Sequence, residues 1–387
     1  MSFQPLAGIK VLDLSRLLPG PLASLVLADL GAQVDKIEDS AGGDYLRVMP
    51  PHIGGTSSAF LALNRNKRSA VLDLKKPKAK EALLRLVRSY DVVLEQFRPG
   101  VLDRLGLSHA TLLAENPKLV VCALTGYGQD GPLKDRAGHD LNYLARAGVL
   151  GQQGPDSGPP TVPGFQLADV SGGLYAVIGI MGALMERART GKGQIVDVAM
   201  IETAMPFAIA GFGLTFGGQA LTRGAEALTG GIAPYQTYAT KDGKAMSLAA
   251  LEPKFWMQFS AGIGHQVDMS DLVPGPHQTE LKAKLRAIFA EKTQAEWVQF
   301  ASERDCCLEP VLSPDEARND PHLAARGMFF ELASSWGTIP QMRTPLTPKD
   351  RTHTSPPRQG EHTDAILREA GLSDAELAAL RADGAIR

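Results

Sequence analysis

The 387-residue sequence contains three cysteines, Cys122, Cys306 and Cys307. So few, in an odd number, exclude a framework of disulfide bonds and indicate a reducing compartment. The net charge is −2, so the chain has no excess of positive charge that would attract nucleic acid as a bulk electrostatic partner. We therefore expect no nucleic acid among its partners.

Segments typical of export or of a membrane are also missing. The N-terminal stretch MSFQPLAGIKVLDLSR lacks the basic segment and apolar core of a signal peptide, and the C-terminal Ala-Ile-Arg is not a peroxisomal signal. The uncharged stretch Val170–Met185 has sixteen residues and is rich in glycine. Since this is short for a membrane span, we expect a buried helix, no membrane contact and a cytoplasmic location.

Short apolar runs alternate with helical patterns over the first 125 residues. This alternation predicts βαβ units and a mostly parallel sheet, that is, a Rossmann-like α/β domain. Strands are expected within residues 9–15, 33–38, 69–75, 91–97 and 118–126, and helices within residues 21–32 and 81–90.

Two familiar functional motifs are absent. The expected strand-to-helix turn SRLLPGPLA, residues 15–23, lacks G-x-G-x-x-G, which argues against a nicotinamide site. No H-E-x-x-H or similarly tight ligand spacing occurs, so we expect no metal and no separate cofactor.

The middle of the chain changes in composition. Residues 211–230 are rich in Gly and Thr and are interpreted as a linker, which leaves a large α/β domain over residues 1–210 and a small α+β domain over 231–320. A hairpin is expected at the start of the small domain, from residues 235–240 and 245–251 around an Asp242-Gly243 turn.

Basic residues gather where the expected strands end. In an open parallel sheet ligands bind at the carboxyl ends of the strands, so these cations could hold phosphate groups. The alternative is an ordinary solvated surface. The residues are Arg47, Arg65, Lys67, Arg68, Arg98 and Arg104.

Three further positions carry chemistry. His139, in the sequence RAGHD, follows an expected strand and could be a base, a metal ligand or a surface residue. Asp169 comes just before a glycine-rich helix, where a carboxylate could also be only an N-cap. Glu252, in LEPKFW, would by itself be read as a surface residue.

Many segments in one order carry a family resemblance. They include LPGPLASLVLADLGAQVDKIE, NRNKRSAVLDLK, VVLEQFRPGVLDRLGL, LTGYGQDGP, RTGKGQIVDVAMIE, DPHLAARGMF and GEHTDAIL. The chain resembles the family III CoA-transferase superfamily nearly end to end. Within it, AGHDLNY, GGIAPYQTY and ALEPKFW resemble the α-methylacyl-CoA racemase branch.

The resemblance implies racemisation of 2-methylacyl-CoA thioesters through an enolate, without a cofactor. Such a reaction is served by two acid–base groups on opposite faces of the α-carbon. His139 and Asp169 would be these groups, and Glu252 would orient the His139 ring. Asp140 is the rival of Asp169. We favour Asp169 because adjacent residues in an extended segment point to opposite sides.

The resemblance also implies the contacts to CoA and the assembly. The chain is expected to form an interlocked, ring-like homodimer, in which residues 321–387 return to the large domain and the site lies between domains of different chains. The residues expected to contact CoA are Arg47, Leu72, Asp73, Leu74, Lys75, Gln96, Phe97, Arg98, Arg104, Gly126, Tyr127, Ala137, Gly138 and Asp140.

Two alternatives remain open. In the first, the protein is a CoA-transferase that uses Asp169 as a nucleophile and forms an anhydride and then an aspartyl thioester. In the second, it binds acyl-CoA without catalysis. His139 argues against the first, and the presence of His139, Asp169 and Glu252 together argues against the second.

Overall fold

The computed structural model describes residues 3–387, which form two compact units. The larger unit comprises the chain up to Ala147, Gly164–Pro206 and Pro321–Arg387, and the smaller comprises Gly148–Pro163 and Phe207–Asp320. Residues 148–163, expected in the large domain, thus belong to the smaller unit. Residues 211–230 also lie within that unit and are not a linker. Their apolar side chains complete helix α9 (Ile209–Phe216), and their glycines mark turns.

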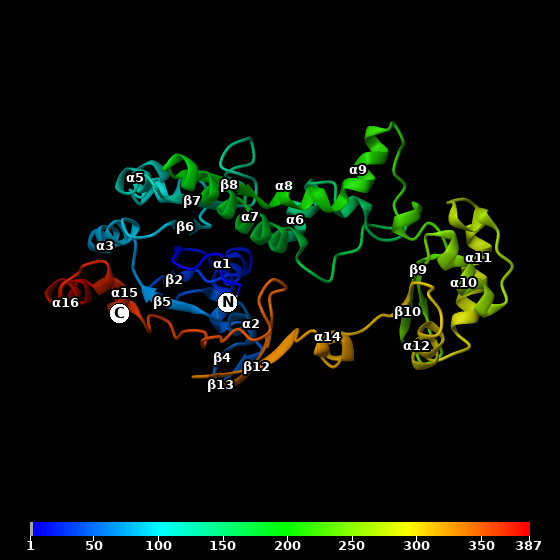
Figure 1. The fold of residues 1–387 in the computed structure, drawn as a ribbon. Helices are drawn as coiled ribbons and strands as arrows, with labels where there is room; N and C mark the ends of the chain where they lie inside the picture. Colours follow the sequence, from blue (N-terminus) through cyan, green and yellow to red (C-terminus); the bar gives the residue numbers. More distant parts are fainter. Residues whose placement is uncertain (1–2) are drawn as a thin grey trace. The chain divides into compact units, whose positions relative to one another are not determined.

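The larger unit is built on a six-stranded parallel sheet, as the sequence predicts. Its strand order is β5-β2-β1-β6-β7-β8 (Figure 1). The strands are β1 (Lys10–Asp13), β2 (Gln33–Glu38), β5 (Lys67–Val71), β6 (Val92–Glu95), β7 (Val120–Thr125) and β8 (Gln194–Ala199).

The strand order reverses beside β1. The chain builds outward from β1 through β2 to β5, then crosses to the other side of β1 and continues through β6, β7 and β8. Loops leave β1 and β6 in opposite directions at such a point, and a crevice opens outside the carboxyl ends of the strands. The fold therefore places a binding crevice next to β1 and β6.

The central strands are apolar along their whole length because helices cover the sheet. All six residues of β7 are buried, as is typical of a parallel strand that is covered on both faces. Helices α1 (Pro19–Asp29) and α7 (Leu167–Thr190) pack against each other and against β1 and β7.

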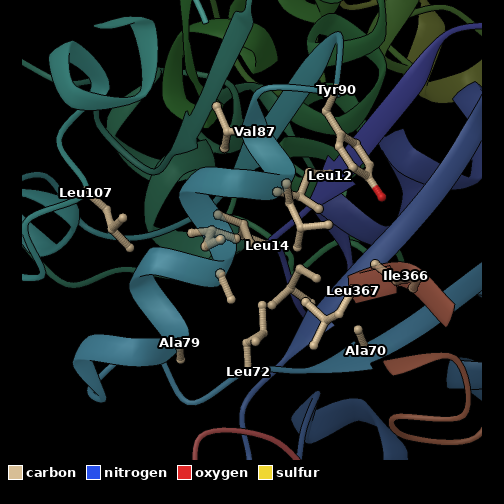
Figure 2. Packing of buried hydrophobic residues seen from close by; sticks show 14 of the residues in the cluster. Leu12, Leu14, Ala70, Leu72, Ala79, Val87, Tyr90, Leu107, Ile366 and Leu367 are labelled. Carbon is tan, nitrogen blue, oxygen red and sulfur yellow. The ribbon is translucent and has the colours of Figure 1, made fainter. Parts of the chain in front are cut away.

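A second apolar layer packs against the alternate side chains of the same strands (Figure 2). Leu12 and Val121 of the sheet contribute to it, together with Leu83 and Leu86 of α3 and Ile366 of the C-terminal segment. Its helices are α3 (Pro77–Val87), α5 (His109–Glu115), α15 (Thr363–Glu369) and α16 (Asp374–Ala382). The C-terminal helices thus complete the core of the N-terminal sheet.

Hydrogen bonds also attach the C-terminal segment. The Thr363 hydroxyl accepts a hydrogen bond from Val71 N at 3.1 Å, and the Ala385 carbonyl accepts one from Asp73 N at 2.9 Å. This part of the unit further contains α14 (Pro321–Ala325) and the antiparallel pair β12 (Phe329–Ser334) and β13 (Gly337–Met342). Helix α13 (Pro314–Arg318) comes before this segment and belongs to the smaller unit.

Helix α7 is, among the described residues, long and apolar enough by length and composition to cross a membrane, but half of its apolar stretch is buried inside the protein. Core helices share this property. The remaining apolar side chains Leu174, Ile178 and Met185 are exposed, with Ile178 at 61% and Met185 at 75%.

The smaller unit is an α+β structure. Its hairpin, β9 (Tyr235–Ala239) and β10 (Ala245–Ala249), confirms the sequence prediction, and β11 (Leu308–Pro310) pairs with β10. Trp256, Phe259, Phe289 and Trp297 form its aromatic core. The helices are α10 (Pro253–Ile263), α11 (Gln278–Phe289) and α12 (Gln294–Ser302).

Other short elements of the larger unit position its loops. They are the turn η1 (Tyr45–Val48), the pair β3 (His52–Ile53) and β4 (Thr56–Ser57), and helices α2 (Ser58–Leu63), α4 (Val101–Arg104), α6 (Asp140–Arg146) and α8 (Met200–Ala204).

Candidate active site

A cavity of about 240 Å³ opens where the strand order reverses. The segments that follow β1, β2, β5 and β6 form its wall, as the topology requires. Six residues expected to contact CoA line it: Leu72, Asp73, Leu74, Lys75, Gln96 and Phe97. Apolar side chains from several strand ends provide a slot for a flat ring, and charged groups stand beside it.

Arg16 also lines this cavity and was missed in the sequence. It lies in the segment after β1, residues 15–23, which lacks a glycine fingerprint. Its residue type and its position in the sequence could have identified it, because an arginine just beyond the carboxyl end of the central strand faces the crevice of such a sheet.

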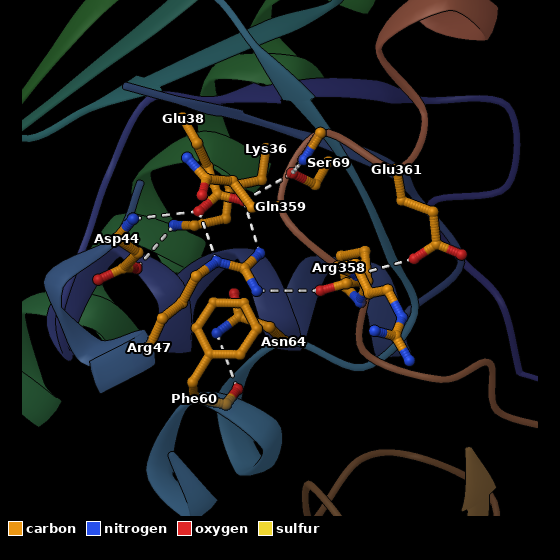
Figure 3. Close-up of polar contacts among 12 residues, drawn as sticks. Lys36, Glu38, Asp44, Arg47, Phe60, Asn64, Ser69, Arg358, Gln359 and Glu361 are labelled. Carbon is orange, nitrogen blue, oxygen red and sulfur yellow. Dashed lines mark hydrogen bonds and ion pairs between the residues drawn. The ribbon is translucent and has the colours of Figure 1, made fainter. Parts of the chain in front are cut away.

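Arg47 occupies a different environment from the one expected. Its guanidinium donates to both carboxylate oxygens of Glu38, at 2.8 and 2.6 Å, and to the Pro357 carbonyl at 3.2 Å (Figure 3). The guanidinium also lies 3.8 Å from the centre of the Phe60 ring. Arg47 is buried and does not line the cavity. Its guanidinium stays in the interior because the carboxylate of Glu38 is buried and needs a cationic partner there. This arrangement speaks against Arg47 as a phosphate anchor.

Two other basic residues of the strand ends serve the interior. Arg65 is fully buried and pairs with Asp29 at 2.5 Å. Lys67, also fully buried, donates to the Pro21 carbonyl and to the Asn64 side chain. Burial lowers the pKa of Lys67 to about 7. Neither side chain is free to bind phosphate.

Arg98 and Arg104 are exposed, and within residues 3–387 no ion pair engages either of them. Arg98 follows β6, and its charge acts on Tyr143. Burial, the largest effect, raises the pKa of Tyr143 to about 12, and Asp169 adds to this rise while Arg98 opposes it. Arg98 therefore lies on the side of the crevice that faces the candidate acid–base residues.

Tyr143 organises the backbone that precedes His139. Its hydroxyl donates to the Gly138 carbonyl at 2.6 Å, and its ring meets that of Tyr127 edge-on, with centroids 5.2 Å apart. A Cβ atom on Gly126 or on Gly138 would lie 2.5 or 2.7 Å from the Tyr143 ring. These glycines are required because an aromatic ring packs directly against their backbone. Ala137, directly before Gly138, is exposed.

His139 is exposed and stands at the N-cap of α6. Its backbone N–H donates to Asn142 Oδ1 at 3.0 Å, which fixes the residue at the helix start. The imidazole thus projects from a rigid position and remains accessible to a substrate.

Asp140 is the first residue of α6 and has a capping role. Its Oδ1 accepts hydrogen bonds from the backbone N–H groups of Ala168, at 2.7 Å, and of Asp169, at 3.2 Å. The expectation that His139 and Asp140 lie together in an extended segment is wrong, because a helix begins between them. The Asp140 carboxylate satisfies free N–H groups in the first turn of α7.

Asp169 is the third residue of α7, and not its N-cap, which is Gln166. Its carboxylate is partly buried, and within residues 3–387 it accepts no hydrogen bond. Burial and then the charge of Asp140 raise the pKa of Asp169 to about 6, although His139 acts in the opposite direction. Such a carboxyl group can hold or release a proton near neutral pH.

Glu252 belongs to the smaller unit, where it is the N-cap of α10 without a capping hydrogen bond from its side chain. Its charge acts on Cys307. Burial, followed by Glu252, raises the pKa of that thiol. Among residues 3–387, no group of three or more His, Cys, Asp and Glu side chains could hold a metal ion.

Comparisons with known proteins extend over nearly the whole chain. The family model described as CoA-transferase family III matches residues 6–363. The α-methylacyl-CoA racemase of Mus musculus is 38% identical, covering 98% of this chain and 96% of the racemase. The succinyl-CoA:glutarate CoA-transferase of the same organism is 31% identical, covering 95% of this chain and 87% of the transferase.

A solved structure agrees with this relationship. The crystal structure of a CAIB/BAIF family protein from Brucella suis superimposes with a TM-score of 0.82 at 32% identity, covering 96% of this chain and all of that one. The sequence match and the shared fold concur: the chain is an enzyme of CoA-transferase family III.

Proposed function

We propose that the protein is an α-methylacyl-CoA racemase, which interconverts (R)- and (S)-2-methylacyl-CoA thioesters. The observation that carries this proposal is the pair formed by His139 and Asp169, where burial and Asp140 raise the pKa of Asp169 to about 6. A racemase needs a second acid–base group that holds a proton near neutral pH, which an ordinary aspartate does not.

In the proposed reaction, one group removes the α-proton and the other returns a proton to the opposite face. With one enantiomer, His139 takes the α-proton, an enolate forms, and protonated Asp169 delivers its proton to the α-carbon. With the other enantiomer, Asp169 is the base and protonated His139 is the acid. The thioester acidifies the α-carbon, so this route requires no cofactor beyond the CoA of the substrate.

The cavity beside β1 and β6 is the proposed place of the nucleotide end of CoA. Leu72, Leu74 and Phe97 supply apolar contacts there, and Arg98 would approach the substrate between the cavity and Tyr143. We propose that Arg98 and Arg104 contribute charge to CoA binding, since both are exposed and make no ion pair among the described residues.

We further propose a homodimer located in the cytoplasm. The exposed apolar residues of α7 support the dimer, because Leu174, Ile178 and Met185 form a face that a second chain could bury. In such a dimer Glu252 of one chain would orient His139 of the other.

A CoA-transferase remains the second candidate, because a transferase is also among the relatives. In that reaction the Asp169 carboxylate attacks the thioester carbonyl and CoA leaves as a thiolate. The thiolate then returns to the resulting anhydride, and the acyl group leaves as a free acid. Transfer to a second acid completes the cycle. Racemisation needs no acceptor acid, whereas transfer cannot proceed without one.

The test follows the α-hydrogen of each pure enantiomer in deuterated water, with no acceptor acid present. We expect His139→Ala to lose exchange of one enantiomer and Asp169→Asn to lose exchange of the other, each by about 10²–10⁴-fold. Racemisation should be lost in both variants. His322→Ala is the matched control, because this exposed histidine lies on α14, outside the proposed site.

One result would contradict the two-base mechanism, and two others would contradict the racemase itself. Equal exchange of both enantiomers in each variant would indicate one base working with solvent. A CoA thioester trapped on Asp169, with turnover only after a free acid is added, would establish the transferase. Tight binding of acyl-CoA by the unaltered protein without any exchange or transfer would indicate a non-catalytic binding protein.

A further inference from the structure

Arg16 is one of two exposed cationic groups of the cavity wall, the other being Lys75, which follows β5. Arg16 is exposed, lines the cavity, and within residues 3–387 forms no ion pair. Its guanidinium carbon lies 4.5 Å from the centre of the Tyr45 ring. Lys36, which also lines the cavity, is instead fully buried and paired with Asp44 at 3.0 Å.

The backbone on both sides of Arg16 is fixed by this buried pair. Lys36 Nζ donates to the carbonyl of Ser15 at 2.7 Å, and the N–H of Leu17 donates to Asp44 Oδ1 at 3.0 Å. Leu17 adopts a left-handed conformation, with φ of 65°. This conformation is unfavourable for a leucine and persists only where the surroundings impose it.

The same carboxylate also fixes Tyr45. Asp44 Oδ1 accepts a second hydrogen bond, from the N–H of Leu46 at 3.0 Å, and so caps the turn η1 that begins with Tyr45. The N–H of Asp44 donates to Glu38 Oε2 at 3.0 Å (Figure 3). Arg16 and the ring beneath it are therefore held by one buried group, which sets the distance between them.

A guanidinium supported in this way has a defined free edge. One face rests on an aromatic ring, while the N–H groups at the edge of the plane remain available for the oxygens of a phosphate. The cavity wall also carries Asp39 and Asp73, which repel a phosphate unless a cation stands nearby. Arg16 supplies such a cation on the side of β1, as Lys75 does beyond β5.

We infer that Arg16 binds a phosphate group at the nucleotide end of the CoA thioester, and that the buried Lys36–Asp44 pair positions it. The inference rests on the proposed function, since it takes the substrate to be a CoA thioester. Two sources of this phosphate are possible in CoA, the ribose 3′-phosphate and the 5′-diphosphate.

The experiment measures the Kd of free CoA, dephospho-CoA and pantetheine by calorimetry. Hydrogen bonds to charged groups contribute about 1.5–3 kcal/mol, so Arg16→Gln should weaken CoA binding about 10- to 100-fold. Pantetheine has no phosphate, so its Kd should not change. Arg16→Lys should retain part of the affinity. Arg189→Gln is the control, because Arg189 is an exposed arginine near the C-terminal end of α7.

The ring beneath Arg16 gives a second pair of variants. Tyr45→Phe keeps the aromatic face and should bind CoA normally, whereas Tyr45→Ala should weaken it. Loss of affinity for CoA but not for dephospho-CoA in Arg16→Gln would assign the contact to the 3′-phosphate, and equal loss would assign it to the diphosphate.

Unchanged CoA binding by Arg16→Gln would overturn the inference. So would an equal loss of affinity for pantetheine, because it would show that the substitution only deforms the loop. Both outcomes leave the proposed function standing. If the unaltered protein binds no CoA, the proposed function itself fails.

Discussion

The Asp140 carboxylate offers the sharpest test of how Asp169 acquires its pKa. In Asp140→Asn the side-chain oxygen that accepts from Ala168 N and Asp169 N can stay in place, while the negative charge is removed. The variant therefore separates the electrostatic effect of Asp140 from its capping of α7.

The expected change follows from the causes of the pKa shift. Burial raises the pKa of Asp169 most, and Asp140 adds to it, giving a value of about 6 against a usual 3.8. Without the charge of Asp140, we expect that pKa to fall by about one unit, which corresponds to ~1.4 kcal/mol. Since Asp169 acts as a base only when it is ionised, its proton abstraction should persist to a pH about one unit lower.

The assay measures the exchange rate of the α-hydrogen for each enantiomer between about pH 4.5 and pH 8, a range that brackets the Asp169 pKa of about 6. Only the enantiomer deprotonated by Asp169 should show the shifted acid limb. Delivery of a proton by Asp169 should weaken at pH 7, because less of its carboxyl group is protonated. An identical acid limb in Asp140→Asn and in the unaltered enzyme would refute this explanation.

Asp140→Ala completes the comparison, because it removes the acceptor as well as the charge. Loss of a helix-capping oxygen costs about 0.5–2 kcal/mol, so this variant should be less stable than Asp140→Asn in urea unfolding. Equal stability of the two variants would mean that the hydrogen bonds to Ala168 N and Asp169 N contribute nothing to α7.

Further predictions concern buried groups. Arg65→Ala leaves Asp29 buried without its cation and should lower the free energy of unfolding by about 3–5 kcal/mol, measured in urea; a loss below 1 kcal/mol would contradict this. Burial lowers the pKa of Lys67 to about 7, so between that pH and 10.5 the unfolded chain binds the extra proton and stability rises with pH. Lys67→Met should remove this part of the slope, and an unchanged slope would refute it. Gly126→Ala would place a Cβ atom 2.5 Å from the Tyr143 ring and should lower kcat or the free energy of unfolding. Gly182→Ala, whose Cβ atom meets open space, should lower neither, and equal effects of the two substitutions would contradict this.

The parallel sheet could be predicted because its strands are recognisable in the sequence. A parallel strand covered on both faces reads as a continuous apolar run, and Val120–Thr125 and Val92–Glu95 fall within the expected ranges. The strand β5 was expected at residues 69–75 but spans Lys67–Val71. Its start is charged and so lacks the apolar run expected of a covered strand, and Arg68 finds its partner Asp35 only once the sheet has formed.

The linker was predicted wrongly for a related reason. A stretch rich in glycine reads as flexible when its long-range contacts are unknown. In the structure a Cβ atom on Gly211 would lie 2.0 Å from Gln152 Oε1. A Cβ atom on Gly231 would lie 2.0 Å from the Ala225 carbonyl oxygen. These glycines permit close contact within the smaller unit rather than separate two domains.

The candidate site was accessible to sequence reasoning in part. The family resemblance pointed to His139 and Asp169, and local order identified Leu72–Lys75, which follows a strand. The role of Arg47 was misjudged, since no pattern shows that Glu38, nine residues earlier, takes up its charge. Arg16 was overlooked because its position depends on Asp44 and Lys36, which the fold brings close to the backbone on both sides of it.

Asp140 bears on whether the N-terminus of helix α7 keeps Asp169 ionised. The positive end of a helix dipole favours a carboxylate in its first turn and lowers the pKa of that group. In α7 the first-turn N–H groups of Ala168 and Asp169 already donate to the Asp140 carboxylate, which brings a full negative charge to the same place. The favourable partial charge is thereby offset, and burial then dominates, so the pKa of Asp169 rises to about 6. The neighbours His139 and Asp140 thus differ in role: His139 stays exposed at the start of α6, and Asp140 raises the pKa of Asp169, the proposed second acid–base group.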